Sequence, residues 1–162
     1  MADMSTWEAN LLLDDESIRA LLATTRRVAV LGIKTEAQAS APAYHVAAFL
    51  AEAGLEIVPV PVYYPDVREI LGRPVFRRLA DVPGLIDIVD VFRRAEDVPA
   101  HLPDLLAKRP RAVWLQLGIR NDRAAEVLAR QGIRVVQDRC LQVDWARLGP
   151  RDRSAPGSPA AR

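Results

Sequence analysis

The chain has 162 residues, of which 50% are hydrophobic, and a formal net charge of +1. This length and apolar content suffice for one buried core without disulfides or metals. The near-neutral charge argues against nucleic acid or a membrane surface as a partner, since both favour basic proteins. No apolar run reaches the roughly 20 residues that span a bilayer, and the acidic N-terminus is unlike a signal peptide, so we expect a cytoplasmic protein.

Cysteine and histidine content limits the covalent and metal chemistry. Cys140 is the single cysteine, which excludes an intrachain disulfide. His45 and His101 are the two histidines, and no ligand spacing typical of zinc accompanies them. We expect one domain over residues 7–148 and a disordered tail over 149–162, which is rich in Pro, Gly, Ser, Ala and Arg.

Short apolar runs alternate with helical patterns along the chain. Buried parallel strands are predicted at residues 28–33, 56–62, 87–92, 112–117 and 134–138. Pro59 and Pro61 count against a central position for the second strand, unless its pairing ends there. Helices are predicted around residues 18–22, from Pro42 to Gly54, briefly between the second and third strands, around 102–106, and from Asn121 to Gly132.

This alternation predicts an α/β fold. We expect a Rossmann-like, doubly wound, parallel five-stranded sheet in three αβα layers, with strand order 3-2-1-4-5. In such sheets ligands bind beyond the carboxyl ends of the strands, where the strand order reverses. The expected crevice therefore lies between the first and fourth strands, with loops 32–41 and 117–121 facing it.

The loop after the first strand favours a phosphate ligand. Gly32 would permit close approach of a phosphate to the backbone, the following helix offers free amides, and Lys34 adds a cation. Alternatively, Gly32 only makes the turn and Lys34 is a solvated charge. The loop lacks two glycines of the dinucleotide fingerprint, and the second strand lacks the acidic residue that binds ribose, which argues against NAD and FAD.

Several segments together resemble a known family. VAVLGI, IVPVPVYYP, DIVDVFRR, VWLQLGIRND and VVQDRC occur in order, as in the small stand-alone CoA-binding proteins, whose domain is similar to the CoA-binding domain of the succinyl-CoA synthetase α subunit. The resemblance implies a Rossmann-like fold and coenzyme A or acyl-CoA as the ligand, with no established reaction.

The resemblance also implies site residues. It places the loop Gly32, Ile33, Lys34 to Ser40 at the CoA phosphates, Pro61, Val62 and Tyr63 near the nucleotide, and Phe92, Arg93, Gln116, Gly118 and Asn121 around the ligand. Tyr63-Tyr64-Pro65 departs from the family's P-V-N-P motif, where an asparagine stands.

Each of these residues has an ordinary structural alternative. Arg93 could hold a phosphate, or pair with Glu96 or Asp97. The Gln116 amide could meet pantetheine or a backbone group, and Asn121 is expected to cap a helix.

Two further side chains have both readings. Tyr63 or Tyr64 could stack on adenine, or pack on the sheet edge. Cys140 could contact the CoA thiol, or be a small buried hydrophobe.

No catalytic constellation emerges from the sequence. We expect a non-catalytic CoA-binding module, a sensor or carrier, with a homodimer or another protein partner left open. The alternatives are an enzyme or enzyme subunit acting on a CoA thioester, a nucleotide binder, or a protein-interaction domain.

Overall fold

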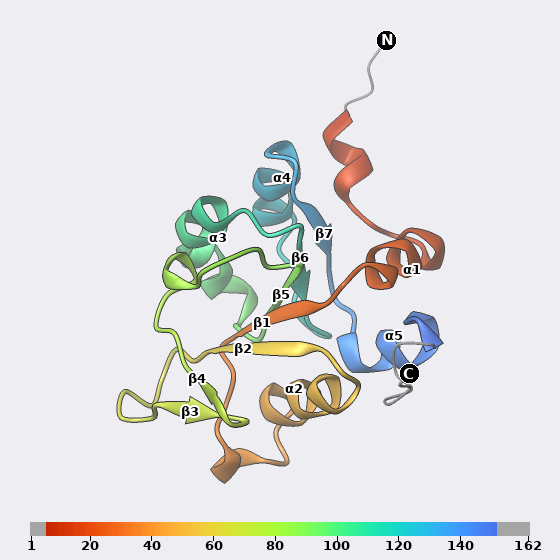
Figure 1. Ribbon diagram of the computed structural model, residues 1–162. Helices are drawn as coiled ribbons and strands as arrows, with labels where there is room; N and C mark the ends of the chain where they lie inside the picture. Colours follow the sequence, from red (N-terminus) through yellow and green to blue (C-terminus); the bar gives the residue numbers. More distant parts are fainter. Residues whose placement is uncertain (1–5, 152–162) are drawn as a thin grey trace.

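A single parallel sheet forms the centre of the protein, whose computed structural model describes residues 6–151. Its strands are β1 (Arg27–Leu31), β2 (Glu56–Val60), β5 (Ile88–Val91), β6 (Ala112–Leu115) and β7 (Arg134–Val136). All are buried except for the first residue of some strands, because helices cover both faces. The predicted α/β, doubly wound, Rossmann-like fold is confirmed (Figure 1).

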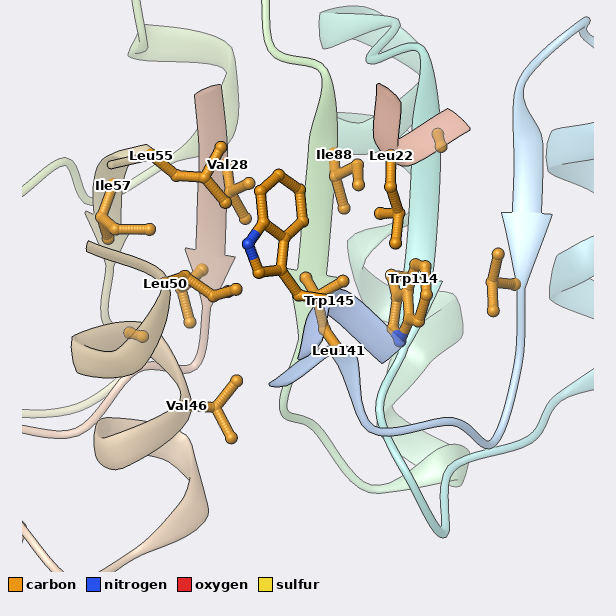
Figure 2. Close-up of a cluster of buried hydrophobic side chains, with 14 of the residues drawn as sticks. Leu22, Val28, Val46, Leu50, Leu55, Ile57, Ile88, Trp114, Leu141 and Trp145 are labelled. Atoms are coloured by element: carbon orange, nitrogen blue, oxygen red, sulfur yellow. The ribbon is translucent and has the colours of Figure 1, made fainter. Parts of the chain in front are cut away.

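Two layers of helices enclose the sheet. Helices α1 (Asp15–Ala23), α2 (Pro42–Glu52) and α5 (Leu141–Leu148) pack on one face, and α3 (Leu102–Lys108) and α4 (Asp122–Arg130) on the other (Figure 1). Alternate strand residues point to opposite layers, so Val28 packs with the first group and Ala29 with the second. Trp114 and Trp145 are among the large side chains in the first layer (Figure 2).

The strand order differs from the expected one. Numbered along the chain, the five strands run 2-1-3-4-5, because β5 pairs directly with β1 through contacts such as Val30 opposite Asp90. The expected order 3-2-1-4-5 placed β2 inside the sheet. Instead β2 is an edge strand, where Pro59 is tolerated because one side needs no ladder hydrogen bonds. The order now reverses between β1 and β5.

The connection from β2 to β5 is also not the short helix that was predicted. It is a hairpin of β3 (Glu69–Ile70) and β4 (Arg73–Pro74), followed by a 3₁₀ turn, η3 (Leu79–Asp81). Leu71 and Gly72 both have positive φ angles, 57° and 70°, as a two-residue type I′ turn requires. The Phe76 amide donates to the Pro59 carbonyl at 3.0 Å, so the end of this hairpin covers the β2 edge.

Polar side chains cap two helices at their N-termini, and one helix, α5 (Leu141–Leu148), was not predicted from the sequence. Asp14 caps α1 through a 2.8 Å bond from the Ser17 amide, and Asn121 caps α4. Two 3₁₀ segments, η2 (Glu36–Gln38) and η4 (Ala95–His101), lie in the loops after β1 and β5, and η1 (Thr6–Asn10) precedes α1. The sequence reading missed α5, although its buried stripe of Leu141, Trp145 and Leu148 has helical spacing.

The described residues end shortly after α5. Of the tail expected to be disordered, residues 152–162 lie outside the described residues. Within residues 6–151, no helix is long and apolar enough to cross a membrane.

Candidate functional site

A cavity of about 710 Å³ opens where the strand order reverses. Its walls come from the loops that follow β1, β5 and β6, the first turn of α2, and the residue before α5. Apolar side chains such as Val46, Phe92 and Leu117 make much of the lining, and Lys34 and Arg93 bring positive charge. Large, mostly apolar hollows with a few polar groups are typical of small-molecule sites.

A smaller hollow of about 220 Å³ continues this cavity toward β2. The two share Lys34, Ala43, Phe92, Arg93 and Arg94, so they adjoin. The smaller hollow adds Gly32, Tyr63, Tyr64 and Asp97. Together they form a groove along the carboxyl edge of the sheet. The loops that follow β1, β2, β5 and β6 all line this groove.

Gly32 holds the ends of β1 and β5 close together. Its φ is 87°, and a Cβ at this position would lie 2.5 Å from the Phe92 carbonyl oxygen and 3.2 Å from Arg93 Cδ. The absent side chain therefore makes room for protein backbone, and the glycine fixes where Arg93 leaves the sheet. The structure therefore favours the alternative in which Gly32 makes the turn over the one in which a phosphate approaches its backbone.

Arg93 is the central polar group of the groove. Its Nε donates to His101 Nε2 at 3.3 Å, its Nη1 lies 3.5 Å from the Tyr63 hydroxyl, and its guanidinium stands 5.5 Å from the Tyr63 ring centre. Its Nη2 is 3.7 Å from Asp97 Oδ2, so the ion pair considered from the sequence exists. The contacts hold the guanidinium against the groove, with 16% of the side chain exposed.

Neighbouring charges around Arg93 are tuned by these contacts. Burial, followed by the charge of Arg93, lowers the pKa of His101, so the imidazole is neutral and accepts the Arg93 hydrogen bond at Nε2. The Arg93 hydrogen bond lowers the pKa of Tyr63. Asp97 binds mainly Arg94, at 2.9 Å, and that hydrogen bond lowers its pKa. Arg93 thus keeps positive charge that no close carboxylate fully neutralises.

A second positive region lies opposite, at the start of α2. The Lys34 side chain makes no hydrogen bond or ion pair with any residue in 6–151. Helix α2 begins at Pro42 after Ala41, which offers no side-chain cap to the first-turn amides. Pro42 has no amide hydrogen, and the Tyr44 amide donates to the Ala41 carbonyl at 2.9 Å. Within residues 6–151 the Ala43 amide is therefore the free donor of this first turn, and an amide there favours an anion.

Gln116 presents an amide at the floor of the cavity. The residue is 4% exposed, and its Oε1 accepts a hydrogen bond from the Leu141 amide at 3.3 Å. The sequence analysis considered a backbone partner for the Gln116 amide, and the amide oxygen has one. Its Nε2 has no hydrogen bond to any residue within 6–151, yet it is not among the fully buried unpaired atoms of these residues, so this donor is open to the cavity that Gln116 lines.

Cys140 and His45 line the cavity near Gln116. Cys140 is half-buried and occupies the N-cap position of α5. His45, on α2, has its Nδ1 3.3 Å from Gln142 Oε1. His45 was not among the site residues predicted from the sequence, although it lies three residues after Pro42 and therefore on the same face of α2.

Five predicted site residues lie outside the groove. Ile33 is buried in the core, and Ser40 is exposed away from both hollows. Pro61 and Val62 line a separate hollow of about 310 Å³ with Arg77 and Arg78.

Asn121 is the fifth of these residues. It caps α4 through Oδ1, as expected, and its Nδ2 donates to the Ala95 carbonyl at 3.0 Å. It therefore joins the loops after β5 and β6 rather than lining the cavity. Gly118 does line the cavity, and its amide donates to Asp138 Oδ1 at 2.7 Å.

Comparison with known proteins decides the family. Residues 26–146 match the family model described as the CoA binding domain. The chain belongs to this CoA-binding family. The matched residues run from the start of β1 into α5, so they include every loop that lines the groove.

Individual relatives of the chain extend the comparison. It is 33% identical over 129 residues to the uncharacterized protein YneT of Bacillus subtilis, across 80% of this chain and 92% of that one. A solved structure from Thermus thermophilus, "cell-free ID.343", shares 39% identity with a TM-score of 0.76, covering 84% of this chain and 99% of that one.

A larger protein shares the fold. An acetyl-coenzyme A synthetase from Candidatus Korarchaeum cryptofilum, solved with phosphate and ADP, is 19% identical with a TM-score of 0.58. The similarity covers 73% of this chain and 26% of the synthetase.

Proposed function

We propose that this protein binds coenzyme A or an acyl-CoA in the groove, as a non-catalytic sensor or carrier. The observation that carries the proposal is the chemical polarity of the groove. Cationic groups gather at the β1 and β5 loops, while apolar side chains and a buried amide lie toward β6 and α5. CoA has the same polarity, with phosphates at one end and an amide-containing thiol arm at the other.

The phosphate end would lie between Lys34, the first turn of α2, and Arg93. The Lys34 side chain has no hydrogen bond or ion pair within residues 6–151, and no side chain caps the first turn of α2. Arg93 is oriented by His101 and Tyr63 before any ligand arrives. A preoriented guanidinium loses little conformational entropy when it binds a phosphate. The exposed Tyr63 ring at the same end offers a face for adenine.

The pantetheine arm would run over Phe92 and Val46 toward Gln116. These residues line the cavity between its cationic end and Cys140. The Nε2 of Gln116, which has no hydrogen-bond partner within residues 6–151, would donate to a pantetheine carbonyl.

The non-catalytic part of the proposal rests on the composition of the lining. Glu96 is the single carboxylate that lines the larger cavity, and Asp97 lines the smaller hollow. Arg94 lies 3.6 Å from Glu96 and 2.9 Å from Asp97, so both carboxylates are held in ion pairs. No serine or threonine among the lining residues could serve as a nucleophile. On incubation with acetyl-CoA, we expect the thioester to persist, followed as free thiol released; multiple turnovers would contradict this part.

The binding test is isothermal titration calorimetry of the full chain with CoA. The wild type should bind, and Arg93→Ala should weaken binding roughly ten- to a hundredfold, the value of a hydrogen bond to a charged group. Arg123→Ala, an exposed arginine on α4, is the matched control and should bind like the wild type. Absence of heat with wild type, or equal losses in both variants, would refute the proposal.

A further inference from the structure

Cys140 stands at the end of the groove opposite to its free cation. It follows β7 and precedes α5, whereas Lys34 follows β1, and both line the same cavity. The thiol is half-buried, so it is accessible from the cavity and sheltered from bulk solvent on its other side, where it packs against the first core layer. A ligand anchored at Lys34 and Arg93 by its phosphates would extend its far end toward this sulfur.

Gln116 gives independent evidence that a ligand reaches this end. The Leu141 amide donates to Gln116 Oε1 at 3.3 Å, which ties Gln116 to the residue immediately after Cys140. The side chain is more than nine-tenths buried, and its Nε2 lines the cavity with no hydrogen-bond partner in residues 6–151. A donor that opens onto the cavity without a protein partner is free to bind a ligand group that accepts a hydrogen bond. The pantetheine arm carries amide carbonyls close to its thiol.

We propose that Cys140 captures coenzyme A covalently, by thiol–disulfide exchange with a CoA disulfide bound in the groove. This inference rests on the proposed function, because the groove must first hold the CoA moiety. The substrate class is a mixed or symmetrical disulfide of CoA, CoA–S–S–R. The product is a protein that keeps CoA bound until a thiol reductant releases it, which suits a sensor or carrier of the CoA redox state.

The exchange balances without another oxidant. Cys140 loses its thiol proton to solvent, and its thiolate sulfur attacks the CoA-side sulfur of the disulfide. The new bond joins Cys140 Sγ to the CoA sulfur, and the original S–S bond breaks. The leaving group R–S⁻ takes up a proton and departs as R–SH. Cys140 is oxidised and the R sulfur is reduced.

Intact-protein mass spectrometry tests the proposal with CoA disulfide as the probe. The wild type should gain one CoA moiety, which dithiothreitol removes. Because Cys140 is the single cysteine, its modification is unambiguous and Cys140→Ser should gain nothing. Binding in the groove should make CoA disulfide react about tenfold or more faster than glutathione disulfide, which lacks the nucleotide. Arg93→Ala should slow the reaction with CoA disulfide, whereas Arg123→Ala, the exposed arginine on α4, should leave it unchanged.

Calorimetry with desulfo-CoA, which has no thiol, separates the two possible failures. If desulfo-CoA binds and slows adduct formation, covalent capture in the groove is supported. If it binds but the two disulfides react equally fast, Cys140 is merely an accessible thiol and this inference is wrong, while CoA binding stands. If neither desulfo-CoA nor CoA binds, the proposed function fails and covalent capture fails with it.

Discussion

Gly32→Ala should lower the free energy of unfolding by about 2–5 kcal/mol, the sum of left-handed backbone strain and overpacking. The φ of 87° is unfavourable for any residue with a Cβ, and that Cβ would lie 2.5 Å from the Phe92 carbonyl oxygen. Backbone cannot move aside as a flexible side chain can, so β1 and β5 would have to separate. Guanidinium chloride unfolding of wild type and variant gives the difference directly.

Gly118→Ala is the matched control for this prediction. Its φ is also 87°, but a Cβ there would meet nothing within 4 Å. It should pay the backbone strain alone, about 1–2 kcal/mol. Equal losses in the two variants would show that the contact with Phe92 is unimportant. Because Gly32 also sets where Arg93 leaves the sheet, Gly32→Ala should weaken CoA binding in addition.

The elements of the fold could be predicted from local patterns, but their order in the sheet could not. Continuous apolar runs and helix caps such as Asn121 act within a few residues, so the sequence shows them directly. Strand order depends on which neighbour a strand meets in space. Pro59 and Pro61 carried information on this point, since proline favours an edge strand, and the expected order gave them too little weight.

The position of the groove was predicted from the sequence, and so were some of the residues that line it. The rule that ligands bind at the carboxyl edge led to the loops after β1 and β6, and the family motifs added Arg93 at the β5 end. The resemblance placed Pro61 and Val62 near the nucleotide, because they match the start of the family's P-V-N-P motif. The actual order puts β2 outermost, so these residues face a different hollow. His45 required knowledge of how α2 packs against α5.

Asp90 is the buried polar group that the fold itself leaves unexplained. It lies in β5 between Val30 of β1 and Trp114 of β6, is fully buried, and neither carboxylate oxygen has a hydrogen-bond partner in residues 6–151. Burial raises its pKa well above the ordinary value of 3.8. The carboxyl is therefore protonated in the folded protein at pH values where it is ionised in the unfolded chain.

This difference sets the direction of a pH effect on stability. Above pH 3.8 the folded state binds a proton that the unfolded state releases, so the stability contributed by Asp90 falls as pH rises. The loss is about 1.4 kcal/mol per pH unit until the folded-state pKa is reached. Below pH 3.8 both states are protonated and the effect disappears.

Asp90→Asn should remove this dependence, because the amide stays neutral in both states and has nearly the same shape. The variant should therefore become progressively more stable than the wild type from acid to neutral pH, with the gap largest at the highest pH. Denaturant unfolding of both proteins across that range measures the gap, and Asp66→Asn, an exposed aspartate in the loop after β2, is the control that should track the wild type. Parallel stability curves for Asp90→Asn and wild type would mean that the Asp90 carboxyl ionises in the folded protein, with water or a local opening supplying the partner that residues 6–151 lack.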